Sequence, residues 1–232
     1  MRSNSPDRAH TEKIRFGRRV FIGLIGAGTL ALLFGRQAAS NLSHRFSRNT
    51  SPEAEGFFRF YNISGIPDIN LSEWSLTVDG LVEKPMTLNF DQFIALPGQS
   101  QRKDFACVTG WVVKNVAWKG IRLKTIFDLV KPKPQAGFIT FHSAETPYFD
   151  SLSVSQALEN GVMLAYEMNG QPLSQEQGWP LRLLVPPMYG YKSVKWMVRM
   201  EFTEQPAIGY WEKAGYPVDA YLGAQVPIFP TF

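Results

Sequence analysis

Proline and glycine divide this chain into short segments. Sixteen prolines and 19 glycines are spread through its 232 residues. Proline interrupts helices and glycine favours tight turns, so the pattern predicts short elements joined by many loops. Apolar residues make up 44% of the chain, which is typical of a globular protein and not of a disordered one.

After residue 57 the spacing of apolar residues predicts both strands and short helices. One helix is expected at 90–96, where Pro97 stops it, and a second around 123–130, where Pro132 ends it. A third is expected to start after a cap at Ser153 and to run through residue 160. Many strands with few short helices indicate an α+β domain built on mixed β-sheets. The expected strands are 74–80, 104–108, 137–142, 181–185 and 193–202.

The N-terminus carries a targeting pattern. Arg18-Arg19 precedes an apolar run, residues 20–34, and resembles a twin-arginine export signal. As a helix this run would be about 22 Å long, shorter than the ~30 Å hydrocarbon core of a bilayer. We therefore expect a signal or membrane anchor at 1–35, a linker at 36–56 and the folded domain at 57–232, located in the periplasm. A plain membrane anchor is the alternative, and cleavage of the leader stays open.

Charge is distributed unevenly. Residues 1–50 hold nine Lys or Arg and two acidic residues, whereas the remainder holds 15 basic and 18 acidic residues. The folded domain is therefore mildly acidic, which argues against nucleic-acid binding.

Several common catalytic patterns are absent from the sequence. It contains no G-x-G-x-x-G after a strand, no P-loop, no C-x-x-C and no H-E-x-x-H motif. His142 is the single histidine of the expected domain, which excludes a zinc site built on a histidine cluster. Cys107 is the single cysteine, so it is either an inert buried thiol or a thiol with a function.

Four segments of the domain form a recognisable series. They are Cys107-Val-Thr-Gly-Trp111, Val116-Ala-Trp-Lys-Gly120, Gly178-Trp-Pro-Leu-Arg-Leu-Leu-Val-Pro186 and Tyr189-Gly-Tyr-Lys-Ser-Val-Lys-Trp196. In sequence and in order they resemble the sulfite-oxidase-type molybdopterin-binding family, and the likeness covers roughly residues 57–222. The branch it resembles most comprises small bacterial enzymes that include periplasmic methionine-sulfoxide reductase catalytic subunits.

The resemblance implies a sulfite-oxidase-like fold, a molybdenum–molybdopterin cofactor and a catalytic Cys107 whose thiolate binds the metal. Gln177 stands where relatives carry Asn or His, Ser143 replaces a family Thr, and Lys192 is expected to face solvent. A core cysteine and solvated basic side chains are the alternatives for Cys107, Arg182 and Lys195. The residues expected to bind the cofactor are Tyr61, Asn62, Cys107, Ser143, Gln177, Arg182, Ser193, Val194 and Lys195.

The same resemblance implies an oxidoreductase of the cell envelope that transfers an oxygen atom. Trp111 stands where sulfite oxidases carry an Arg near their anionic substrate, which favours a neutral S-oxide or N-oxide. Sulfite dehydrogenation and a non-catalytic envelope domain that has lost the cofactor are the alternatives. The chain has no C-x-x-C-H haem motif, so electrons are expected from a membrane haem protein, a quinol-linked subunit or a cytochrome. The catalytic domain is expected to be monomeric.

Overall fold

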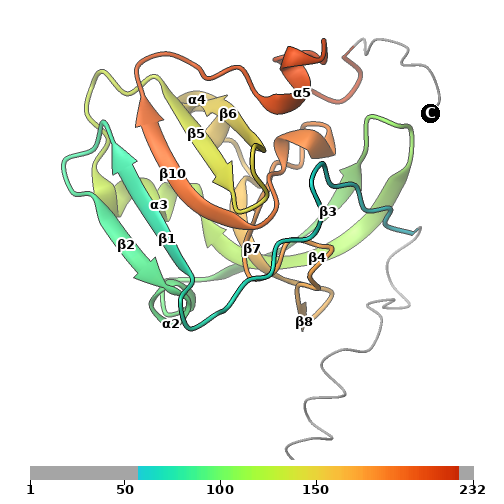
Figure 1. Cartoon of the computed structure of the whole chain (residues 1–232), viewed down its shortest axis with the longest axis horizontal. Coiled ribbons are helices and arrows are strands. Elements are labelled where there is room, and N and C mark those ends of the chain that lie inside the picture. The colour runs from blue at the N-terminus through green and yellow to red at the C-terminus, as the bar shows by residue number, and fades with distance from the viewer. Residues whose placement is uncertain (1–56, 225–232) are drawn as a thin grey trace, which may run out of the picture. The chain divides into compact units, whose positions relative to one another are not determined.

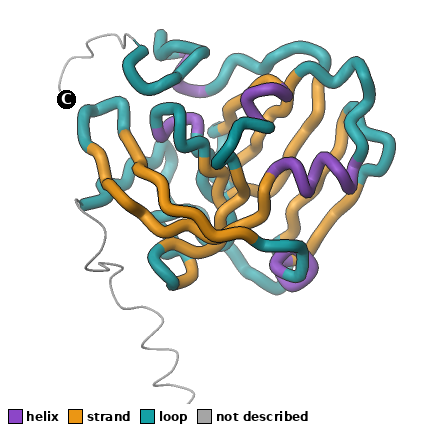
Figure 2. The backbone as a smooth tube through the Cα atoms, turned by 180° about the vertical axis from the view of Figure 1, so that it is seen from behind, coloured by secondary structure: helices purple, strands orange, loops and turns teal. Residues whose placement is uncertain are grey.

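The computed structural model describes residues 57–224 of the chain. Strands predominate among its elements, and the helices are short (Figure 2). The strands are β1 (Ser75–Gly80), β2 (Met86–Asn89), β3 (Gln99–Ala106), β4 (Val112–Arg122), β5 (Phe138–Ser143), β6 (Phe149–Ser153), β7 (Met163–Met168), β8 (Gln171–Pro172), β9 (Arg182–Leu184) and β10 (Met197–Thr203). The helices are α2 (Phe90–Ile94), α3 (Leu123–Val130), α4 (Val154–Ala157), the 3-10 helix η2 (Gly190–Lys192) and α5 (Tyr210–Lys213).

The strands form two five-stranded sheets (Figure 1). The first has the order β2-β1-β10-β5-β6, in which β1 and β10 are parallel and the other neighbours antiparallel. The second has the order β3-β4-β7-β8, and β9 also pairs with β7. The mixed sheets with few short helices confirm the predicted α+β class.

Strand β7 separates two hydrophobic clusters. Leu164 and Tyr166 pack into the larger cluster, whereas Met163 and Ala165 pack into a smaller one on the opposite face. Successive side chains of a strand point to opposite faces, so a sheet covered on both sides needs apolar residues at every position. The smaller cluster includes Phe105 and lies next to the candidate site described below.

Local capping and packing explain the helices. Asn89 and Gln92 form a reciprocal capping box at the start of α2, and Ser153 forms the same motif with Gln156 in front of α4. The buried face of α3 is formed by Leu123, Ile126, Phe127 and Val130, as the spacing predicts.

The clearest differences from the predicted boundaries concern two helices and two strands. Strand β3 runs from Gln99 to Ala106, where 104–108 was predicted. The helix capped by Ser153 ends at Ala157, before the expected residue 160, and α2 ends at Ile94. The predicted strand 193–202 begins only at Met197, because η2 and an irregular segment precede it. The expected signal or anchor helix lies outside the described residues. Between residues 57 and 224 no helix is long and apolar enough to span a membrane.

Candidate functional site

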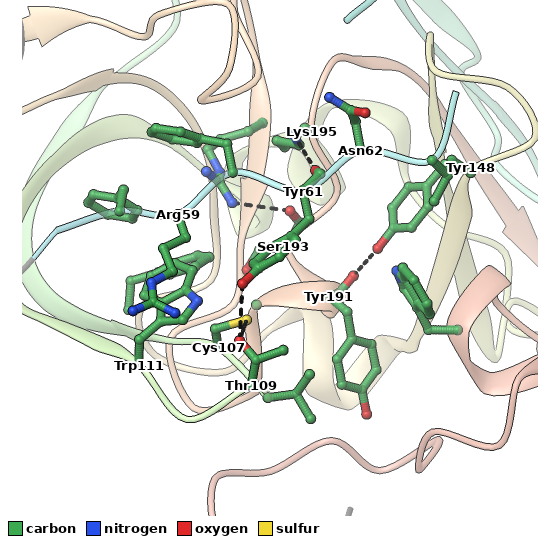
Figure 3. A pocket seen from close by; sticks show the side chains of 18 of the residues that line it. Arg59, Tyr61, Asn62, Cys107, Thr109, Trp111, Tyr148, Tyr191, Ser193 and Lys195 are labelled. Carbon is green, nitrogen blue, oxygen red and sulfur yellow. Dashed lines mark hydrogen bonds between the residues drawn. The ribbon is translucent and has the colours of Figure 1, made fainter. Parts of the chain in front are cut away.

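A cavity of about 220 Å³ lies where segments distant in the sequence meet (Figure 3). Its walls come from an N-terminal strap (residues 58–63), the β3–β4 turn, the loop after β5, β9, the segment 190–195 and the region of α5. The polar and aromatic side chains that bear on function are Arg59, Tyr61, Asn62, Cys107, Thr109, Trp111, Glu145, Tyr148, Arg182, Ser193 and Lys195.

Cys107 lies in the tight turn between β3 and β4. Its backbone N–H donates to the carbonyl of Trp111 at 2.9 Å, and the N–H of Gly110 donates to the carbonyl of Cys107 at 3.0 Å. The hydroxyl of Thr109 donates to Sγ of Cys107 at 3.3 Å. The thiol is only partly covered and lines the cavity (Figure 3), so the alternative of a buried core cysteine does not hold.

The protein offers few other metal ligands here. No group of three or more His, Cys, Asp or Glu side chains able to hold a metal ion occurs among residues 57–224. A metal at Cys107 would therefore take most of its ligands from a cofactor. A soft thiolate together with dithiolene sulfurs is a donor set of this kind.

Arg182, on β9, is a buried cation in the cavity wall. Its Nη1 donates to the carbonyl of Gln177 at 3.1 Å, and its Nη2 donates to the carbonyl of Ser193 at 3.2 Å. The guanidinium also lies 4.9 Å from the ring centre of Phe105 and 5.5 Å from that of Trp118. Burial lowers the pKa of Arg182 to about 10. The solvated alternative for Arg182 is therefore wrong.

Lys195 reaches the same cavity from the chain preceding β10. Its Nζ donates to the carbonyls of Tyr61 at 2.7 Å and Glu176 at 3.3 Å. Burial, and then the charge of Arg182, lower the pKa of Lys195 to about 8. Gly178 has a positive φ of 101°, and a Cβ there would lie 2.8 Å from Cβ of Lys195, so only glycine allows this close approach.

Ser193 and Val194 lie between these two cations along the chain. Ser193 lines the cavity, and its hydroxyl accepts from the N–H of Val185 at 3.0 Å. Val194 is buried in the larger hydrophobic cluster, and its carbonyl accepts from the N–H of Leu183 at 2.8 Å. Its side chain is not part of the cavity lining, so a role for Val194 would have to use its backbone.

Two expected cofactor residues direct their side chains into their own turns. The hydroxyl of Ser143 accepts from the N–H of Glu145 at 2.9 Å, and Oε1 of Gln177 accepts from the N–H of Ser174 at 2.8 Å. Both residues are buried, and neither lines the cavity. Their contact with the cofactor stays a prediction.

The N-terminal strap is held by a residue that the sequence did not single out. The buried carboxylate of Glu145 accepts from the N–H groups of Ile63 and Ser64. Tyr61 and Asn62, both predicted cofactor residues, line the cavity next to these anchors. No motif around Glu145 indicates this role in the sequence. The hydrogen bond from Ser64 to Glu145 joins residues more than 80 positions apart, so it becomes visible only in the fold.

Arg59 is a second residue that sequence reasoning missed. It lies on the strap, lines the cavity together with Trp111, and is solvent-exposed (Figure 3). Trp118, by contrast, is fully buried in the smaller cluster. Although residue 111 is an indole, the strap thus brings an exposed cation to the same cavity.

The expectation that Lys192 faces solvent is wrong. Its side chain is 1% exposed and forms ion pairs with Asp150 and Glu212. These acidic residues come from β6 and α5, so their proximity could not be read from the sequence around Lys192.

The site fits an anionic, metal-bearing cofactor. In the described part of the chain, Arg182 and Lys195 bond to carbonyl oxygens and pack on aromatic rings, and neither pairs with a carboxylate. Burying a cation without a counter-charge is costly, and a phosphate would supply that charge. Gly190 adds space, since a Cβ there would lie 2.7 Å from the ring of Phe105.

Comparison with known proteins agrees with this arrangement. The family described as "Oxidoreductase molybdopterin binding domain" matches residues 63–211. The uncharacterized oxidoreductase YuiH of Bacillus subtilis is 34% identical over 186 residues, covering 80% of this chain and 92% of that protein. The protein-methionine-sulfoxide reductase catalytic subunit MsrP of Campylobacter jejuni is 29% identical over 235 aligned positions, covering 87% of this chain and 78% of that protein.

A solved structure shares the fold. The sulfane dehydrogenase SoxCD of Paracoccus pantotrophus superimposes with a TM-score of 0.58 at 24% identity. The match covers 62% of this chain and 41% of that chain. At this identity the likeness concerns the architecture alone.

Proposed function

Since the chain belongs to the molybdopterin-binding oxidoreductase family, and is thus an enzyme that uses molybdenum–molybdopterin, we propose that it reduces S-oxides or N-oxides in the cell envelope. Family membership favours this enzyme over a non-catalytic domain that has lost the cofactor. The observation that carries the proposal is the partly exposed Cys107 thiol in a cavity that also holds Arg182 and Lys195.

Each residue of the site has a defined task in this proposal. Cys107 would provide the protein's sulfur ligand to molybdenum, and the Thr109 hydroxyl, which donates to that sulfur at 3.3 Å, would orient it. Arg182, Ser193 and Lys195 would hold the phosphate end of the pterin. When bound, the cofactor supplies the two-electron oxygen-atom-transfer chemistry, while the protein supplies binding and orientation.

The cavity walls support a neutral substrate. Trp111, Tyr148 and Trp211 give the cavity an aromatic lining suited to an apolar group beside a polarised S–O or N–O bond. The Campylobacter relative is described as a protein-methionine-sulfoxide reductase. We therefore assign a sulfoxide such as that of methionine as the first substrate to test.

Sulfite oxidation is the second candidate, and one observation favours it. Arg59 is a cation at the cavity that forms no ion pair with a carboxylate in the described part of the chain. A guanidinium suits an oxyanion through paired hydrogen bonds. This residue could take over the role that an arginine at position 111 has in sulfite oxidases.

Location and electron supply complete the proposal. The twin-arginine pattern supports export of the folded, cofactor-loaded domain to the periplasm, although those residues lie outside the described range. Electrons for a reductase would come from a membrane haem protein, a quinol-linked subunit or a cytochrome, because the sequence has no haem-attachment motif.

The direction of the reaction separates the two candidates. Purified holoenzyme is assayed for oxidation of a reduced dye by methionine sulfoxide and, separately, for oxidation of sulfite. The proposal predicts faster turnover of the sulfoxide, and faster turnover of sulfite would contradict it. Arg59→Gln should affect sulfite turnover more than sulfoxide turnover, and Lys114→Gln, an exposed cation on β4, is the matched control.

A further inference from the structure

Three buried ionisable side chains meet behind the cavity wall. Nζ of Lys192 lies 2.6 Å from Oδ1 of Asp150 and 2.5 Å from Oε1 of Glu212. The three side chains are 1%, 3% and 2% exposed, respectively. They come from η2, β6 and α5, so the cluster joins three elements distant in the sequence.

The second oxygen of each carboxyl group has no visible partner. Oδ2 of Asp150 and Oε2 of Glu212 are both buried and form no hydrogen bond within residues 57–224. Both groups crowd the same glycine: a Cβ on Gly209 would lie 2.1 Å from Oε2 of Glu212 and 3.0 Å from Cγ of Asp150. The two carboxyl groups therefore lie side by side against Gly209.

The charges of the cluster do not balance if all three groups are ionised. One ammonium and two carboxylates leave a net negative charge away from water, which is strongly unfavourable. Among residues 57–224, Lys192 is the one cation that forms an ion pair with either carboxyl group. Lys213 lies 4.9 Å from the ring centre of Phe149, and the charge of Arg182 acts on Tyr148. Tyr148 and Tyr191 face the carboxyl groups, and their hydroxyls donate to the carbonyls of Tyr191 and Pro217.

A single proton resolves this imbalance. Two carboxyl groups held together in a protein interior bind one proton between them, as a coupled pair. Burial, and the adjacent Glu212, raise the pKa of Asp150 well above its usual range even though Lys192 opposes the shift. A bound proton would also give the two unpartnered oxygens a hydrogen bond.

We propose that Asp150 and Glu212 share one proton, and that the resulting neutral cluster with Lys192 is a positioning clamp for the wall of the cavity. Tyr191 and Ser193 flank Lys192 in the chain, Trp211 precedes Glu212, and all three line the cavity. The clamp fixes η2 and α5 relative to β6, and so holds the wall from behind. This inference depends on no particular substrate.

Infrared spectroscopy tests the shared proton directly. Above the pH at which ordinary carboxyl groups are ionised, the wild type should retain the carbonyl stretch of a protonated carboxylic acid, with the shift expected in deuterium oxide. The band should disappear in Asp150→Asn and in Glu212→Gln, since one carboxylate and one ammonium then balance without a proton. Asp128→Asn, at an exposed carboxyl on α3, should leave it unchanged. Absence of the band in the wild type, or its persistence in both variants, overturns the proposal.

The pH dependence of stability gives a second readout. The native state would hold a proton that the unfolded chain releases. Its stability therefore falls as pH rises through the raised native pKa. Both amide variants should lose stability less steeply over this range than the wild type does. A slope identical to that of the wild type in both would contradict the shared proton.

The positioning role is tested on the holoenzyme. Glu212→Gln keeps a hydrogen-bond acceptor for Lys192 and should retain its molybdenum content. Lys192→Met leaves the carboxyl pair without its cation and should weaken cofactor retention about tenfold, as loss of a supporting residue commonly does. If Lys192→Met does not fold, the infrared comparison of the two amide variants still decides the proposal. Equal molybdenum content in Lys192→Met and the wild type would contradict the clamp.

Discussion

The guanidinium of Arg182 donates from Nη2 to the backbone carbonyl of Ser193 at 3.2 Å. The same group donates from Nη1 to the carbonyl of Gln177 at 3.1 Å. One buried cation therefore joins β9 to the segments that contain Gln177 and Ser193. Because both partners are neutral carbonyls, its charge remains available for an anionic ligand.

Arg182→Lys should weaken cofactor retention. A lysine ammonium cannot bridge both carbonyls in the planar geometry of a guanidinium. Loss of one charge-assisted hydrogen bond costs about 1.5–3 kcal/mol, or roughly ten- to a hundredfold in affinity. The measurement is pterin content after purification from a host that makes molybdopterin. Arg199→Lys, outside the cavity and paired with Asp79, is the control, and equal pterin content in the two variants would refute the prediction.

Lys195 should make the stability of the cofactor-free protein vary with pH in the alkaline range. Its native pKa of about 8 lies below the ordinary value of 10.5, so the unfolded chain binds more protons between these values. Stability contributed through this residue is therefore lowest below pH 8 and rises toward pH 10.5. Urea unfolding across this range should show that rise relative to Lys195→Gln. If the difference between the two proteins is independent of pH, Lys195 does not titrate as described.

Trp111→Arg should shift substrate preference toward anions. Adding a second guanidinium beside Arg59 strengthens oxyanion binding and removes apolar surface from the cavity. The ratio of kcat/KM for sulfite to kcat/KM for methionine sulfoxide should rise about tenfold, the effect of roughly 1.4 kcal/mol. Trp111→Phe keeps an aromatic ring and should leave this ratio nearly unchanged. An unchanged ratio in Trp111→Arg would show that residue 111 does not contact substrate.

Gly178→Ala should destabilise the protein and disturb Lys195. The backbone has a φ of 101°, and the new methyl group would lie 3.0 Å from Cα of Lys195. We expect a loss of about 3 kcal/mol from strain and collision together. Gly170→Ala also has a positive φ, 74°, but meets no atom within 4 Å, so it should lose only about 1 kcal/mol. Urea unfolding measures both, and equal losses would exclude the collision with Lys195.

Much of the fold follows from local patterns. The helical spacing of Leu123, Ile126 and Val130 defines α3, and alternation of apolar residues defines β1. Strand β7 was not predicted, because a strand buried on both faces has no alternation to detect. Parallel pairing of β1 with β10 is equally hidden, since it joins residues more than 100 positions apart.

Contiguous motifs identified residues that the structure brings together at one cavity, while their contact with a cofactor stays a prediction. Cys107, Arg182, Ser193 and Lys195 all line the cavity, and their motifs lie close to them in the sequence. Glu145 and Arg59 were missed because their roles arise from contacts between remote segments. Lys192 was misjudged for the same reason, since Asp150 and Glu212 reach it from other elements.

Metal analysis of the purified protein tests the central claim most directly. When the protein is produced in a host that makes molybdopterin, the wild type should contain about one molybdenum atom per chain. Cys107→Ser should keep the fold, as judged by circular dichroism, and lose the metal. A stably folded wild type without molybdenum, or a Cys107→Ser variant with full molybdenum content, would contradict Cys107 as the protein ligand of the metal.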